Sequence, residues 1–344
     1  MFCKPRLLLL AFALAAGAVL VALLASTIGR APVRPPLPNP NGYDDFIKAG
    51  EAVLGDVSDW LVLDHDGLRD LVSTNAEPLR LLRLGLTRHC IMPMESALTN
   101  NAAFSLTNNA AFRHLPGIKR LGQLLAAEGR LREMENQPAE AAQSYVDAIR
   151  YGNEMSRGGF LITWLVGNLC EKVVCARLAK LVPKLNPDEA RAVLKDLEKL
   201  DFGRVTWAEV QQSEGRERRY ELRKPLNPIM GVRVWWEWRR EMQYAKWKYK
   251  NVVARERLLA AELALRCYQS ERGLPPARLG ELATNYLSHV PEDPFSGKPL
   301  IYRAQGTNWL LYSVGPDGVD DGGTPVGPVV GSESKGDLFF DSPL

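Results

Sequence analysis

The sequence predicts a mainly α-helical protein with an amino-terminal transmembrane helix, a helical-bundle domain and a small carboxyl-terminal α+β module. Three features of the 344 residues predict this: an uncharged segment near the start, apolar residues at helical spacing through the middle, and short apolar runs between glycines near the end. The composition, 46% hydrophobic and 24% charged, is typical of a folded protein. We expect a membrane anchor at 1–30, a proline-rich spacer at 31–41, the helical domain at 42–250 and the module at 251–344.

The anchor prediction rests on 22 consecutive residues without a charge, Leu7–Ile28, which Lys4 and Arg6 precede. This length matches the roughly 20 helical residues that cross a bilayer, whereas a cleaved signal peptide, the alternative, usually has an apolar core of about 7 to 15. A short stub ahead of a large domain favours a single-pass protein of a bacterial-type inner membrane, with the bulk of the chain in the periplasm. The spacer would then be stiff and extended.

The charge and the motifs narrow the classes of function. Lys and Arg number 43 and Asp and Glu 40, so the formal net charge is only +3, and nucleic acid is not an expected partner. The four histidines are far apart in the sequence, and no phosphate-binding loop, zinc-protease helix motif, nucleophile elbow or dinucleotide fingerprint is present. We therefore favour a non-enzymatic protein that binds or scaffolds a protein partner through its helical domain.

Apolar stripes predict the helices of the middle region. Pro138 stands in the first turn of one stripe, and Pro187, after Asn186, begins another. The uncharged run Phe160–Cys170 is too short to cross a membrane and suits a buried helix of a bundle. Small and aromatic residues near the first stripe, Gly129, Ala141, Tyr145 and Ala148, keep a spacing that resembles one tetratricopeptide hairpin. No second copy follows at 34 residues, so an ordinary helical hairpin is the alternative.

Asp64, His65 and Asp66 form the cluster of this region that most resembles a catalytic group. Adjacent carboxylates and an imidazole can act as acid and base, which makes a hydrolase the enzymatic alternative. The other interpretation is a turn that caps the next helix, and we favour it because a single short motif seldom suffices for catalysis.

Residues 233–257 are basic and aromatic, with eight Lys or Arg, three Glu and six Trp or Tyr. This composition is typical of a helix at a membrane surface, where rings lie at the headgroup level and cations meet anionic lipid. The alternative is that the rings pack into the bundle while the cations face water.

The carboxyl-terminal module carries an ordered series of motifs: 264–268 (ALRCY), 272–275 (RGLP), 290–294 (VPEDP), 297–302 (GKPLIY) and 309–317 (WLLYSVGPD). This series resembles the carboxyl-terminal half of the major pseudopilin, protein G, of type II secretion. The resemblance implies a helix, a β-hairpin and a loop that binds calcium through the carbonyl of Val314 and the carboxylates of Asp317 and Asp337. A component of a type II secretion or pilus-like system is therefore another alternative.

The residues themselves predict the same hairpin and calcium-binding loop, independently of this resemblance. Apolar runs on both sides of Gly306 indicate a hairpin. A folded loop after it is indicated by four closely spaced glycines, Gly315, Gly318, Gly322 and Gly323. Residues 313–344 contain six acidic side chains and one lysine, a net charge of −5. Such crowding of oxygens favours a calcium ion as a structural staple, to which Asp320 and Asp321 would add ligands.

Overall fold

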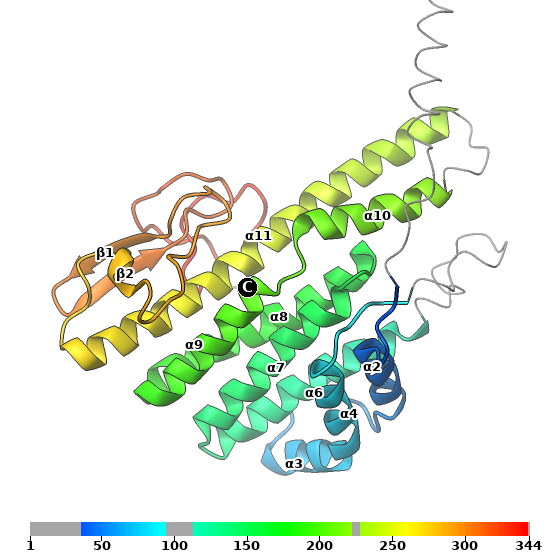
Figure 1. Ribbon diagram of the computed structural model, residues 1–344, viewed down its shortest axis with the longest axis horizontal. Helices are drawn as coiled ribbons and strands as arrows, with labels where there is room; N and C mark the ends of the chain where they lie inside the picture. The colour runs from blue at the N-terminus through cyan, green and yellow to red at the C-terminus, as the bar shows by residue number, and fades with distance from the viewer. Residues whose placement is uncertain (1–35, 94–112, 222–227, 343–344) are drawn as a thin grey trace, which may run out of the picture.

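The computed structural model describes residues 36–93, 113–221 and 228–342, and Figure 1 shows how they are arranged. The described chain is mainly helical and holds one two-stranded antiparallel sheet, which confirms the predicted helical class and the carboxyl-terminal hairpin. The predicted anchor at 1–30 and the first part of the spacer lie outside the described residues. In the three described ranges, no helix is both long and apolar enough to span a membrane.

The first three helices form one end of the molecule: α2 (Gly42–Glu51), α3 (His65–Thr74) and α4 (Ala76–Leu86). Asn75, between α3 and α4, is fully buried and fastens them to the chain after α2. Its Oδ1 accepts from the N–H of Leu54 at 2.8 Å, and its Nδ2 donates to the carbonyls of Leu54 and Leu71 at 3.1 and 2.9 Å. These bonds satisfy a buried amide that would otherwise be costly.

The next two helices, α6 (Leu115–Met134) and α7 (Pro138–Ser156), form an antiparallel hairpin, and Pro138 lies in the first turn as predicted. The residues of the tetratricopeptide-like spacing meet inside this hairpin. A Cβ atom at Gly129 would lie 2.3 Å from the ring of Tyr145, so the glycine makes room for a tyrosine that is fully buried. The predicted hairpin is therefore observed as a packing unit.

The bundle continues with α8 (Leu161–Leu181), the 3₁₀ turn η1 (Val182–Lys184), α9 (Pro187–Phe202) and α10 (Trp207–Glu221). The uncharged run forms the first half of α8, but it is buried only in part, because Ile162 and Leu169 are exposed. The two central helices approach closely, since a Cβ on Gly167 of α8 would lie 2.3 Å from the carbonyl of Gly152 on α7. At the start of α9, Asn186 and Glu189 form a reciprocal capping box, which explains why the helix begins there.

The longest helix, α11 (Pro228–Arg272), runs across the molecule (Figure 1). It packs against α8, α9 and α10, and the hairpin strands β1 (Ile301–Gln305) and β2 (Asn308–Tyr312) follow it after the 3₁₀ turn η2 (Leu279–Leu282). The helix is continuous through residues 250 and 251, where the sequence places the domain boundary. In register, Ile301 opposes Tyr312 and Gln305 opposes Asn308, with Gly306 at φ 66° in the turn. One hydrophobic cluster extends from α2 to the module.

Candidate functional site

The five residues predicted to hold calcium lie in the loop that follows β2, and the structure separates their roles. Val314 is buried, and its N–H donates to Asp293 Oδ2 at 2.9 Å. Asp317 lies in an exposed turn, where its Oδ1 accepts from the N–H of Val319 at 3.1 Å. The first two predicted ligands therefore stand in different surroundings, one in the core of the module and one in solvent.

Asp337 is the buried centre of the loop, with no exposed surface. Its Oδ1 accepts from the N–H of Asp321 at 3.3 Å and its Oδ2 from that of Gly323 at 2.7 Å, while Asp321 Oδ2 accepts from the N–H of Gly336 at 2.8 Å. Burial raises the pKa of Asp337, and the amide hydrogens act in the opposite direction. The two carboxylates thus fasten the two arms of the loop to each other.

Asp320 joins the loop to the hairpin. Its Oδ1 accepts from the Tyr312 hydroxyl at 2.8 Å and from the N–H of Gly322 at 2.9 Å, and its Oδ2 lies 3.8 Å from Arg303. The hydroxyl and the amide lower the pKa of this exposed carboxyl, and Arg303 adds a smaller effect in the same direction.

Backbone and hydroxyl donors thus occupy many of the oxygens that were predicted to meet a metal. In the part of the chain that the structure describes, no group of three or more Asp, Glu, His or Cys side chains is arranged to hold a metal ion. Four of the predicted oxygens accept no hydrogen bond from a described residue: the Val314 carbonyl, Asp317 Oδ2, Asp320 Oδ2 and Asp321 Oδ1. Calcium binding by the five residues stays a prediction.

Asp293 is a residue of this module whose role the sequence analysis missed, although it lies in the quoted motif 290–294. It is completely buried, its Oδ1 accepts from Ser313 Oγ at 3.0 Å and from the N–H of Phe295 at 2.9 Å, and its Oδ2 accepts from Val314. The side chain therefore holds the turn before β1 against the end of β2. An Asp between Pro291 and Pro294 could have indicated a turn, but its partners 20 and 21 residues away could not be foreseen.

Asp64, His65 and Asp66 lie at the start of α3. Asp64 is the N-cap, and its Oδ1 accepts from the N–H of Gly67 at 2.8 Å, as the helix-capping interpretation predicted. His65 Nδ1 lies 3.3 Å from Asp66 Oδ1, and its Nε2 lies 3.7 Å from Glu135 and 3.1 Å from Arg69. The Asp66 side chain is 87% exposed, so this cluster lies on the surface.

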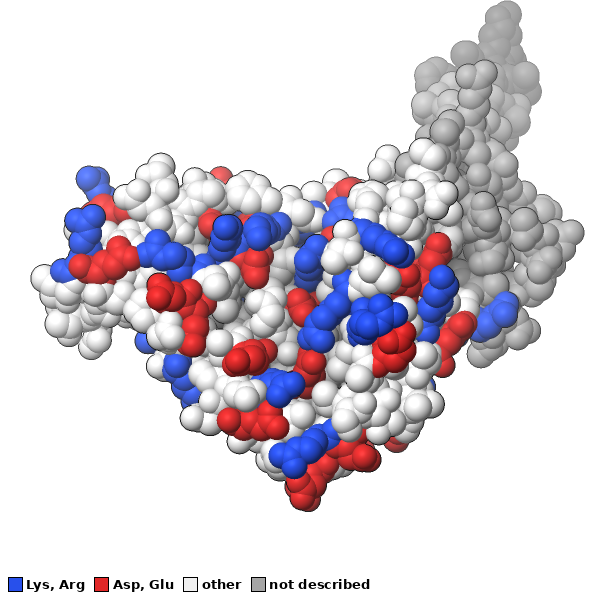
Figure 2. All heavy atoms as spheres, turned by 60° about the horizontal axis from the view of Figure 1, so that its bottom comes forward, with Lys and Arg blue, Asp and Glu red and all other residues white. Residues whose placement is uncertain are grey.

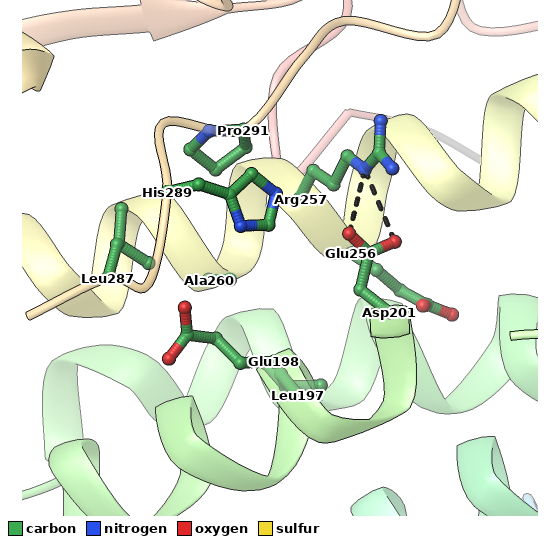
Figure 3. Close-up of a pocket in the computed structure, with 9 residues that line it drawn as sticks. All are labelled: Leu197, Glu198, Asp201, Glu256, Arg257, Ala260, Leu287, His289 and Pro291. Atoms are coloured by element: carbon green, nitrogen blue, oxygen red, sulfur yellow. Dashed lines mark hydrogen bonds and ion pairs between the residues drawn. The ribbon is translucent and has the colours of Figure 1, made fainter. Parts of the chain in front are cut away.

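A small pocket lies elsewhere, where α9, α11 and the chain before β1 meet (Figure 3). Its charged groups pair with one another across this boundary. Arg257 Nε donates to both oxygens of Asp201, at 3.2 and 3.1 Å, and its Nη1 donates to the carbonyl of Glu292 at 2.8 Å. Glu198 accepts from the N–H and the hydroxyl of Ser288, both at 2.7 Å. The surface that lines the pocket is mainly apolar, and these polar contacts beside it join α9, α11 and the chain before β1.

Behind this junction, three charged side chains form a buried cluster that the sequence analysis did not anticipate. Arg204, from the turn between α9 and α10, donates to Glu171 of α8 at 3.2 Å and to Glu256 of α11. The side chains are only 4 to 6% exposed. Burial raises the pKa of Glu256 to about 8, although Arg204 opposes this, and burial also raises the pKa of Glu171. Burial and the guanidinium of Arg204 thus act in opposite directions on the pKa of both carboxyls.

The basic aromatic stretch forms the amino-terminal half of α11, and the structure describes its side chains from residue 236 onward. Met242 and Ala245 are buried against α8 and α10, in a small apolar cluster that Trp238 and Tyr249 flank. The side chains of Trp236 and Tyr244 are 60% and 51% exposed. Some rings of the stretch therefore pack into the bundle, and others are exposed. Contact with a membrane surface stays a prediction.

The surface of the bundle carries mixed charge, unlike the basic stretch of α11. Figure 2 shows acidic and basic side chains interspersed over the face that includes α3, α7 and α9, with no extended area of one sign.

Comparison with known proteins adds no assignment: no protein-family model matches the chain, and no curated protein or solved structure is significantly similar to it.

Proposed function

We propose that the protein is a membrane-tethered, non-enzymatic scaffold whose helical domain and carboxyl-terminal module present one continuous surface to a protein partner outside the cytoplasm. Residues 7–28 would anchor the chain in a bacterial-type inner membrane, and residues 31–41 would connect this anchor to the folded body. The observation that carries the scaffold proposal is the extended polar and apolar junction between bundle and module.

Four contacts hold the part of the module that follows α11, residues 273–342, against α9 and α11. Arg255 of α11 donates to the carbonyl of Ser342 at 2.7 Å, Trp309 Nε1 to Glu262 at 2.8 Å, and Gln269 to the carbonyl of Thr307 at 2.6 Å. The fourth is the Glu198 bond to Ser288. These bonds come from α9 and from three separate turns of α11, so rotation of this part of the module would break several of them together. A fixed relative geometry suits a scaffold better than a pair of mobile domains.

The topology is tested in membranes from cells that express the full chain. We expect the chain to resist extraction with alkaline carbonate, and the module to be digested when protease is added to spheroplasts. A chain that begins at residue 31 behind a cleavable signal is the matched control and should be released into the periplasmic fraction. Carbonate extraction of the full chain, or protection of its module in spheroplasts, would refute the topology. Copurification with secretion machinery would favour the type II secretion alternative.

A structural calcium ion in the loop after β2 is the second part of the proposal. It is supported by the net charge of −5 in residues 313–344 and by the unbonded oxygens of Asp317 and Asp321. Added calcium should raise the melting temperature of the chelator-treated protein and slow proteolysis of the loop, because an ion that binds only the folded state stabilises it. Asp317→Asn should remove that increase and leave the melting temperature in chelator unchanged. If calcium has no effect on the unmodified chain, the loop is held by its amide bonds alone.

A further inference from the structure

The amino-terminal half of α11 carries three lysines that form no ion pair with a described residue. Between residues 236 and 250 there are five Lys or Arg and two Glu. Lys246, Lys248 and Lys250 pair with no carboxylate of a described residue; Lys248 Nζ lies 4.7 Å from the Tyr244 ring centroid and Lys250 Nζ 5.7 Å from that of Phe295. The three ammonium groups thus remain available to an anionic partner.

Like charges crowd one another at this place. The pKa of Lys250 is lowered by partial burial and then by Lys246, while Asp293 acts in the opposite direction. The pKa of Lys172 on the neighbouring α8 is lowered by burial and then by Arg255 and Lys248. A cation that is disfavoured by neighbouring cations gains more from a nearby anion than an isolated one does. The crowding therefore extends the positive field from α11 onto α8.

The order of residues around the helix places three rings and Arg240 on one face, with the lysines on both sides of it. At about 100° per residue, Trp236, Arg240, Tyr244 and Trp247 lie within about 80° of one another, opposite the buried Met242. Lys246 and Lys250 flank this aromatic stripe on one side, and Lys248 on the other. Tyr244 and Trp247 stack with centroids 5.4 Å apart. Rings in the middle with cations on both edges are typical of a helix that lies in the headgroup region of a bilayer.

We infer that this face of α11 rests on an anionic phospholipid surface, with Tyr244 and Trp247 at the level of the headgroups and Lys246, Lys248 and Lys250 against their phosphates. A lipid fits better than an acidic protein because the lysines point to both sides of the stripe, which suits a continuous plane of charge rather than one acidic groove. The inference goes beyond the proposed function, because the face can meet lipid whether or not residues 7–28 anchor the chain.

The test uses the full chain in vesicles that contain phosphatidylcholine brominated in its acyl chains, with or without phosphatidylglycerol. Five of the eight tryptophans lie between residues 207 and 247, so quenching of tryptophan fluorescence reports contact of this region with lipid. We expect stronger quenching in the anionic vesicles, and a loss of the difference in 1 M salt, where the Debye length falls to about 3 Å.

The decisive variant replaces Lys246, Lys248 and Lys250 by Glu. At about fivefold in affinity for each lysine near an anionic surface, it should weaken docking at least about 100-fold and reduce quenching to its value in zwitterionic vesicles. The matched control changes three exposed lysines elsewhere, Lys184, Lys195 and Lys298, to Glu, with the same change in net charge. It should be quenched like the unmodified chain.

Two results would overturn the inference. One is equal quenching of the unmodified chain in both kinds of vesicle. The other is equal loss in the two triple variants, which would show a general charge effect. Circular dichroism of both variants checks that each is folded, and carbonate extraction of the same vesicles reports the anchor separately. A chain that is extracted but still quenched selectively by anionic lipid would refute the tether and leave the docking face standing.

Discussion

Replacement of Arg204 by Met tests whether the buried charge cluster stabilises the junction of α8, α9 and α11. The substitution keeps an unbranched side chain of similar length and removes the guanidinium that both Glu171 and Glu256 share. Removing one partner of a buried ion pair costs about 3 to 5 kcal/mol, because a charge is left without compensation. The loss of stability should therefore be large for a single substitution.

The protonation of the cluster sets how this loss depends on pH. With Arg204 gone, Glu171 must take up a proton to stay buried, and at pH 7 this costs about 3.4 kcal/mol for a carboxyl whose ordinary pKa is 4.5. At pH 5 the same uptake costs only about 0.7 kcal/mol. The gap in stability between the variant and the unmodified protein should thus widen by at most about 2.7 kcal/mol between pH 5 and pH 7.

Thermal unfolding followed by far-ultraviolet circular dichroism at the two pH values measures this gap. The rescue variant carries Met at positions 171, 204 and 256, which removes the charges together and should recover most of the lost stability. Two results would refute the reasoning: a difference in stability that is the same at pH 5 and pH 7, or a triple variant no more stable than Arg204→Met. The first would contradict proton uptake by Glu171, and the second would contradict the cost of an uncompensated buried charge.

Three further substitutions test the other contacts. Glu256 binds its proton in the folded state up to a pH of about 8 and releases it near 4.5 when unfolded, so stability should fall as the pH rises from about 5 to 8, and Glu256→Gln should flatten that slope in thermal melts. Asp293→Ala leaves three donors without an acceptor, at about 1 to 3 kcal/mol for each one that stays buried, and should speed proteolysis after β2; Asp293→Asn, which keeps one acceptor, should be milder. Gly129→Ala should cost about 1 to 3 kcal/mol by urea unfolding, because its Cβ would lie 2.3 Å from Tyr145, whereas Gly215→Ala, with open space around it, should be neutral or stabilising.

Local signals in the sequence predicted the parts of the fold that form from neighbouring residues. The cap of Asp64 on α3, the start of α9 at Pro187 and the hairpin turn at Gly306 all depend on contacts within a few residues, and each lies where the sequence indicates. The continuity of α11 through residue 250 was not predicted. Composition changes along that helix, from basic and aromatic to apolar, because its two halves meet different surroundings, and this change resembles a domain boundary when only the sequence is read.

By itself, then, the sequence determined the helical class, the caps and the hairpin, since hydrogen bonds and apolar spacing over three or four residues dictate them. Only the tertiary structure decided which charged side chains carry the junction. Arg204 bonds to partners 33 and 52 residues away, and Asp293 bonds to one 20 residues away. Because such partners leave no signal in the neighbouring sequence, these residues cannot be told from surface charges before the fold is known. The structure also divided the basic stretch into a packed side and an exposed side, because that depends on which neighbours α8 and α10 provide.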